Sequence, residues 1–469
     1  MLLGYDDEPL FSLTCRRPGR PATNYYPGTL VSMTDAADSP RRFAPAVRAV
    51  VTNRMTLWIA FIAVHFWLGM LNLYGPGFPL GDVTLVYKLW TDQIVINNYW
   101  VGVDSVWVYP LLAIVPMLAS FAFGPALYAS TWLTIVMLLD AVAFAAITGW
   151  VTSRNRAAVG WWWIAFLLLL GPIALARIDS ITVPLAIVGV ILLVTRPTAA
   201  AVVLTIAAWI KVWPAAILLA IVIASRRRRE VVVAGAAVSA AIVVVALLFG
   251  SGTNVFSFVT QQTGRGLQVE APVTTLWLWL AKAGVPGTQV YYDQDILTYQ
   301  MLGRGVSETA AVMTPVLVVA VIAVAALGVW ATRRGARASQ LLAPLALALV
   351  TTLIAFNKVG SPQFISWLAV VVVLGLGTRH AGFGRSFAVP AAIVIVIAAL
   401  TQAFYPYLYI DLLSLNPILL VDITARNLLL FVLLAWAVRE VVFVGLHPEP
   451  AEPLIAAESR SAAHTFSKD

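Results

Sequence analysis

Long apolar runs separated by short polar connections dominate the chain from residue 55 to residue 444. A membrane-crossing helix needs about 20 predominantly apolar residues, so these runs predict an all-α polytopic membrane protein with about 12 transmembrane helices. Several runs are shorter than a straight crossing requires, which indicates broken or tilted helices. The expected crossings are residues 55–74, 106–122, 126–148, 160–176, 181–195, 200–224, 231–250, 311–331, 341–356, 363–377, 387–404 and 426–444.

Polar segments flank the membrane domain, which we place at residues 55–445. Residues 1–54 are rich in arginine, proline and serine and lack the apolar core of about 7–15 residues that a signal peptide requires. We therefore predict a disordered, basic cytoplasmic arm, with Met33 as an alternative start to Met1. Residues 446–469 are predicted to form a disordered cytoplasmic tail.

The composition excludes a soluble enzyme. Hydrophobic residues make up 61% of the 469 positions and charged residues only 11%, whereas soluble domains average about 25% charged residues. The net charge of +8 comes from arginines between hydrophobic runs, which favours membrane topology over nucleic-acid binding as its cause. One cysteine excludes a disulfide framework, and no spacing of His, Asp or Glu is typical of a metal site, so we expect no metal cofactor.

Basic connections set the predicted orientation in the plasma membrane. Arginines at 226–229, 333–337 and 379–385 are expected in the cytoplasm together with both termini. Arg154 and Arg156 are exceptions to this scheme, and the same count puts Arg177 and Asp179 inside. The segments then expected outside are 75–105, 149–159, 196–199, 251–310, 357–362 and 405–425.

The long polar stretch from Tyr74 to Pro110 is the first candidate for a functional site. Asp82 follows Gly81 and begins an amphipathic segment suited to a membrane surface. A carboxylate there can accept the proton of an attacking hydroxyl, whereas the structural alternative is an N-cap, because aspartate is favoured where helices begin. Tyr87, Lys88 and Tyr109 lie in the same stretch.

Two further polar segments carry cations. Arg265 lies between two glycines, which would let its planar guanidinium approach a phosphate. Gln268 and Glu270 would share one side of an extended segment and could bind sugar hydroxyls; the alternative is a solvated turn with an Arg–Glu contact. Lys358 and Gln363 occupy a short link between apolar runs, where the lysine either extends to the headgroups or binds phosphate.

Charged residues also occur inside or beside apolar runs. Lys211 precedes Pro214 within one long run, which predicts a helix break and a side chain that faces a cavity or a partner. Arg177 and Asp179 are either part of a site or a structural ion pair. His65 and Asp140 are expected to be hydrogen-bonded inside the bundle rather than catalytic.

Six motifs in this order resemble glycosyltransferase family 87, over about residues 55 to 375. Members have the GT-C fold and are polyprenyl-phosphate-mannose-dependent mannosyltransferases. The motifs are Gly81-Asp82…Tyr87, Val108-Tyr109-Pro110-Leu111, Arg177-Ile178-Asp179, Trp209-Ile210-Lys211-Val212-Trp213-Pro214, Gly264-Arg265-Gly266-Leu267-Gln268-Val269-Glu270 and Asn357-Lys358-Val359-Gly360-Ser361-Pro362-Gln363.

The resemblance implies an inverting glycosyltransferase with Asp82 as its catalytic base in the first extracytoplasmic loop. It also implies a polyprenyl-phosphate sugar donor and a glycolipid or polysaccharide acceptor. The sugar is mannose by resemblance, with arabinofuranose as an alternative. The substrate-binding positions that it implies are Tyr87, Lys88, Tyr109, Arg177, Asp179, Lys211, Arg265, Gln268, Glu270, Lys358 and Gln363.

Two other classes of function compete with this interpretation. A transporter or lipid flippase would use Lys211, Asp140 and Arg177 along a path through the membrane, and would be expected to contain inverted repeats, which the sequence does not show. A non-catalytic scaffold would leave Asp82 facing away from any cavity.

Overall fold

The structure, a computed structural model, describes residues 49–149, 157–261, 264–380 and 386–448. The predicted tail and nearly all of the predicted arm lie outside these residues. From Val50 onward the chain forms one compact unit. Its described residues are predominantly helical, with one two-stranded hairpin.

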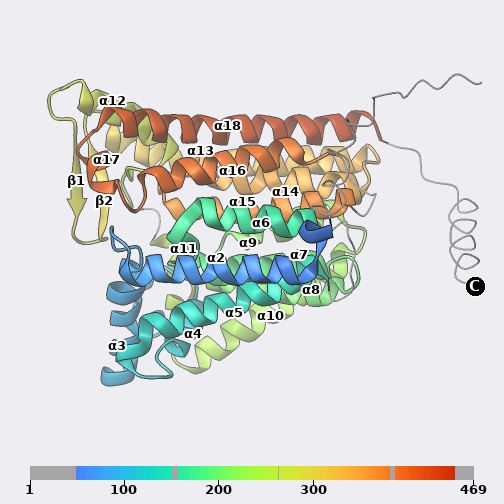
Figure 1. Cartoon of the computed structure of the whole chain (residues 1–469), viewed down its shortest axis with the longest axis horizontal. Coiled ribbons are helices and arrows are strands. Elements are labelled where there is room, and N and C mark those ends of the chain that lie inside the picture. Colours follow the sequence, from blue (N-terminus) through green and yellow to red (C-terminus); the bar gives the residue numbers. More distant parts are fainter. Residues whose placement is uncertain (1–48, 150–156, 262–263, 381–385, 449–469) are drawn as a thin grey trace, which may run out of the picture. The chain divides into compact units, whose positions relative to one another are not determined.

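Apolar helices build the body of this unit, because their backbone groups are satisfied within each segment. Figure 1 shows many of them side by side, with α14 packed against both α13 and α18 and α7 against α8. The helices of the bundle are α2 (Arg54–Tyr74), α5 (Tyr128–Thr148), α6 (Ala157–Leu170), α7 (Asp179–Leu192), α8 (Pro197–Ile210), α9 (Pro214–Ala224), α10 (Arg228–Leu248), α13 (Val306–Arg333), α14 (Ala338–Ala355), α15 (Ile365–His380), α16 (Ala388–Phe404) and α18 (Pro417–Leu446).

Short elements gather at one end of the bundle, which we call the loop end: the end that carries residues 75–110, 249–261, 264–305 and 405–416 (Figure 1). They are the π-helical turn η1 (Asp82–Tyr87), α3 (Lys88–Asn97), α4 (Ile114–Ala119), α11 (Ser257–Thr260), α12 (Thr275–Lys282), β1 (Gln289–Asp293), β2 (Thr298–Leu302) and α17 (Tyr409–Leu413).

Seven helical segments of the described chain are long and apolar enough to cross a membrane. They are Arg54–Tyr74, Pro125–Thr148, Ala157–Ala174, Arg228–Leu248, Val306–Arg333, Ala338–Ala355 and Pro417–Leu446. Five further apolar helices are shorter, such as Asp179–Leu192 and Pro214–Ala224. The expected count of about 12 crossings stays a prediction, because a short helix does not by its length alone span the ~30 Å hydrocarbon layer.

Two expected crossings differ from the observed helices. The run 106–122 forms only a short 3₁₀ turn from Leu111 and the six-residue helix α4, and Gly124, at a φ of 84°, lies in the turn before α5. The run 200–224 is two helices rather than one, because Lys211 adopts an extended backbone (φ −150°, ψ 131°) and Pro214 begins α9. The break expected near Pro214 is therefore present, but it separates two helices, α8 and α9, instead of interrupting a single crossing.

Because of these two differences, the connections between residues 122 and 200 lie at the opposite end of the bundle from the one predicted. A Cβ on Gly160 would lie 3.3 Å from Thr148 and 3.5 Å from Leu57, so the end of α5 and the start of α6 lie near the start of α2. The expectation that 149–159 shares an end with 75–105 is wrong, and Arg154 and Arg156 lie outside the described residues.

The connections on either side of α7 are corrected in the same way. Arg177, expected at the opposite end from Asp82, is in contact with it at the loop end, 2.9 Å away. Since α7 starts there and packs along α8, the connection 196–199 lies at the far end, contrary to prediction. One predicted crossing is missing, because α4 does not cross, and one is doubled, because 200–224 holds two helices. The two shifts cancel, so from α10 onward each described connection lies at the predicted end of the bundle.

Backbone contacts join two polar segments at the loop end. The amide N–H of Gln268 donates to the carbonyl oxygen of Lys358 at 3.1 Å, and that of Val269 donates to Tyr299 in β2 at 3.2 Å. Gly360 makes this approach possible, since a Cβ there would lie 2.1 Å from the nitrogen of Ala271. The links 264–271 and 357–363 therefore form one structural unit.

We expect Gly360→Ala to lower the free energy of unfolding by about 1–3 kcal/mol, the usual cost of overpacking, because backbone rather than a flexible side chain meets the new methyl group. Thermal unfolding of the purified protein in detergent measures the effect. Gly69→Ala is the matched control, because nothing lies within 4 Å of its added Cβ. Equal melting temperatures for the two variants would contradict the close approach.

Candidate active site

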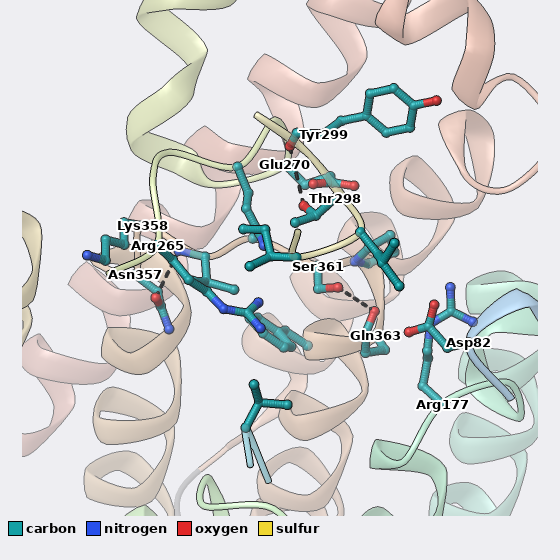
Figure 2. Close-up of a pocket in the computed structure, with 18 of the residues that line it drawn as sticks. Asp82, Arg177, Arg265, Glu270, Thr298, Tyr299, Asn357, Lys358, Ser361 and Gln363 are labelled. Carbon is teal, nitrogen blue, oxygen red and sulfur yellow. Dashed lines mark hydrogen bonds and ion pairs between the residues drawn. The ribbon is translucent and has the colours of Figure 1, made fainter. Parts of the chain in front are cut away.

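A cavity of about 690 Å³ lies at the loop end. The structure brings ten of the twelve predicted site residues to its wall, from the first loop, the turn before α7, the α8–α9 break and the two joined links. They are Asp82, Tyr87, Tyr109, Arg177, Lys211, Arg265, Gln268, Glu270, Lys358 and Gln363. Figure 2 shows Asp82 and Arg177 on one side of this cavity, with Arg265, Asn357 and Lys358 on the other.

Asp82 lies in the first turn of η1 and pairs with Arg177, whose Nε is 2.9 Å from Oδ2 of the carboxylate. The start of η1 has no side-chain cap, so the capping alternative for Asp82 does not describe its contact. The Arg177 side chain is 9% exposed, whereas that of Asp82 is 42% exposed. The carboxylate is thus anchored from behind and open to the cavity in front.

Arg177 uses its remaining donors on three backbone or side-chain oxygens. Nη1 donates to the carbonyls of Pro79 (2.6 Å) and Ala176 (2.9 Å), and Nη2 donates to the hydroxyl of Tyr405 (2.6 Å). Burial is the largest influence on the pKa of Arg177 and lowers it, but Asp82 and the neighbouring tyrosines together raise it further, so the net direction is upward. The guanidinium is permanently charged and fixes the carboxylate in place.

Arg265 and Lys358 supply positive charge on the opposite wall. Nε of Arg265 is buried and has no hydrogen-bond partner among the described residues, and burial lowers the pKa of its guanidinium. Lys358 is 5% exposed, and burial lowers the pKa of its ammonium group. Cations removed from water in this way gain most from an anionic ligand.

Lys211 is the third cation on the wall. Its ammonium group lies 4.5 Å from the ring centroid of Tyr109 and 5.9 Å from that of Phe364. Both distances are within the range of cation–π contact, which holds a lysine without neutralising it. The break between α8 and α9 therefore places a charge at the cavity, as its sequence indicated.

Glu270 lies deeper in the wall. The hydroxyl of Tyr409 donates a short hydrogen bond to its carboxylate, and Nη2 of Arg426 donates to its backbone carbonyl at 3.2 Å. Burial raises the pKa of this carboxyl. The side-chain partner of Glu270 is thus Tyr409. The segment is therefore not the solvated turn with an Arg–Glu contact that the sequence left open.

Two predicted site residues do not reach the cavity. Lys88 pairs with Asp92 at 2.6 Å, one helical turn away on α3. Asp179 is fully buried at the start of α7, where one oxygen accepts a hydrogen bond from the indole of Trp367 at 2.6 Å. His65 and Asp140, expected to be hydrogen-bonded in the bundle, form such a contact at 3.1 Å.

Sequence reasoning missed several residues of the cavity and its support. The arginine at 426 lies within a long apolar helix, which is itself a signal of a buried partner. The tyrosines occupy connections that carried no motif, so only the folded chain brings them together. The missed residues are Tyr292, Tyr299, Asn357, Ser361, Tyr405, Tyr409 and Arg426.

The fold and the cavity define a membrane protein whose loops build one polar site at one end of a helical bundle. The sequence pattern of glycosyltransferase family 87 matches residues 107–362, more than half of the chain. The chain belongs to this family and is a membrane glycosyltransferase. No curated protein and no solved structure matches it. Asp82 precedes the matched residues, so its part in the site rests on geometry.

We expect Arg177→Gln to lower the free energy of unfolding by about 3 kcal/mol, because loss of the guanidinium leaves buried oxygens without a donor. Chemical denaturation of the protein in detergent measures this change. Lys88→Gln is the control, since it removes a half-buried i,i+4 pair, and such pairs near the surface are worth at most about 1 kcal/mol. A loss for Arg177→Gln no larger than for this control would show that Arg177 does not organise the loop end.

Proposed function

We propose that this glycosyltransferase transfers mannose from a polyprenyl-phosphate donor to a hydroxyl of a glycolipid or polysaccharide, with Asp82 as the general base. The observation that carries the proposal is the Asp82 carboxylate. It is held by Arg177 at 2.9 Å and opens into a cavity whose other wall carries Arg265 and Lys358. A base and a set of phosphate-binding cations are the two parts that such a transfer needs.

The reaction is a single displacement at the anomeric carbon. The acceptor hydroxyl attacks from the face opposite the phosphate, its oxygen forms the new bond to carbon, and its proton passes to Asp82. The bond between the anomeric carbon and the phosphate oxygen breaks, and the electron pair leaves with the polyprenyl phosphate. Attack from the opposite face inverts the configuration of the sugar.

Cations on the cavity wall would hold the departing phosphate. Negative charge grows on its oxygens as the bond breaks, and donors already in place there lower the barrier. Arg265 offers a buried donor with no partner in the described chain, and Lys211 offers an ammonium group held only by aromatic rings in the contacts described above. These residues supply the charge compensation without a metal ion in the proposed scheme.

Arg177 is a positioning residue in this scheme. It faces Oδ2 of Asp82, which leaves Oδ1 to accept the hydroxyl proton. Its ties to Pro79 and Tyr405 hold the pair relative to the remainder of the wall.

The distribution of basic residues supports an extracytoplasmic site. The hydroxyl of Thr332 donates to the carbonyl of Ile223 at 3.3 Å, so the ends of α9 and α13 meet. The arginines at 226–229 and 333–334 follow those ends, whereas the cavity touches α13 near its start, at Met313 and Thr314. With the arginines in the cytoplasm, as the positive-inside tendency favours, the cavity would open outside, which supports the proposed site.

Asp82→Asn should lower kcat about 10²–10⁴-fold, since an amide cannot take the proton. Transfer from radiolabelled polyprenyl-phosphate-mannose to glycolipid acceptors by purified enzyme in liposomes measures this rate. Asp92→Asn is the control, because Asp92 pairs with Lys88 outside the cavity. Near-normal turnover by a folded Asp82→Asn enzyme would rule out the assignment.

Arg265→Gln should lower kcat about 10²–10³-fold, the usual effect of losing a donor to developing charge. The same assay measures it, with Arg304→Gln as the control, since Arg304 is exposed and does not line the cavity. Phosphate binding by Arg265 is excluded if both variants keep wild-type kcat and the same KM for the donor.

A further inference from the structure

Four tyrosines form a continuous row along the cavity wall. The ring centroids of Tyr405 and Tyr409 are 5.3 Å apart, those of Tyr409 and Tyr299 are 5.9 Å apart, and those of Tyr299 and Tyr292 are 4.9 Å apart. All four residues line the cavity. We call this set the tyrosine row.

The row begins beside the proposed base. The hydroxyl of Tyr405 accepts a hydrogen bond from Arg177, which in turn pairs with Asp82. The hydroxyl of Tyr409 is held by Glu270. Because the inner two rings are fixed by their hydroxyl groups, they are rigid surfaces rather than mobile side chains.

The row ends at the β-hairpin on a solvent-exposed ring. Tyr292 and Tyr299 are direct partners across β1 and β2, and Tyr292 is 45% exposed. Tyr291, the neighbour of Tyr292 on the opposite face of β1, is 38% exposed but does not line the cavity. Because successive side chains point to opposite faces of a strand, Tyr292 faces the cavity and Tyr291 faces away from it.

We infer that the tyrosine row is an extended acceptor subsite that binds an oligosaccharide, with the sugar that accepts the new residue beside Asp82 and the following sugars toward Tyr292. This inference rests on the proposed function and deepens it. It names the acceptor as a chain of several neutral sugars rather than a single sugar.

The chemistry of the row fits sugars better than the donor phosphate. Tyrosine presents an apolar face with a polar tip, so it packs against the C–H surface of a sugar while its hydroxyl meets the sugar hydroxyls. Arg177 meets the row at the Tyr405 hydroxyl, whereas Figure 2 shows Arg265 and Lys358 across the cavity from Asp82. The acceptor hydroxyl must lie at Asp82, and the row starts there.

Acceptor length tests this inference. Octyl α-mannoside and an octyl α-linked mannotetraoside are compared as acceptors for the purified enzyme in liposomes. Tyr292→Ala should raise KM for the tetraoside about fivefold, the scale of one aromatic contact, and leave KM for the monosaccharide unchanged. Tyr292→Trp keeps a ring and should retain the wild-type ratio.

Tyr291→Ala is the matched control, because it removes the same ring from the same strand on the other face. Its two KM values should equal those of the wild type. If Tyr292→Ala changes both acceptors equally, or if Tyr291→Ala has the same effect on the tetraoside, the extended subsite is wrong.

A binding measurement separates this inference from the proposed function. Saturation-transfer NMR with the Asp82→Asn enzyme detects the free mannotetraose without turnover. Binding that is weakened by adding Tyr292→Ala, but not Tyr291→Ala, supports the subsite even if no mannosyl transfer is found, in which case only the proposed function fails. Equal binding in all three proteins, or none in any, overturns the subsite.

Discussion

The buried guanidinium of Arg177 is the contact on which the loop end depends. Its donors reach the first loop through Asp82 and Pro79, its own turn before α7 through Ala176, and the connection after α16 through Tyr405. A cation this buried is stable only when its donors are satisfied. The same contact therefore fixes the wall of the cavity and orients the carboxylate that we propose as the base, so architecture and chemistry share one residue.

The sequence predicted the class of the molecule, and most of the predicted site residues reach the cavity wall, but it did not predict the order of the ends. Hydropathy identifies apolar runs, yet it does not tell whether a run crosses, turns back as α4 does, or breaks as at Lys211. Arg177 was therefore placed at the wrong end, although its motif had singled it out. In a mostly apolar chain only a few sites can hold a charged side chain, which explains why Arg265 and Lys358 line the same cavity.

The residues that sequence reasoning missed have a common physical cause. Tyr405 and Tyr409 lie in a connection without a basic residue or a glycine, and Tyr292 and Tyr299 become partners only through the register of a hairpin. Their roles come from contacts between segments far apart in the chain. Lys88 shows the reverse case, because its position one helical turn before Asp92 gives it a local partner that competes with a site.

The backbone bond between Gln268 and Lys358, together with the close approach at Gly360, has a consequence for how such enzymes diversify. Arg265 and Lys358 belong to different links, yet their backbones are fastened to each other. A change of loop length or sequence on one link shifts both cations, so the two segments are expected to be inherited, exchanged or redesigned as one module. The hairpin is joined to this module through β2, which is hydrogen-bonded to residues 267–269.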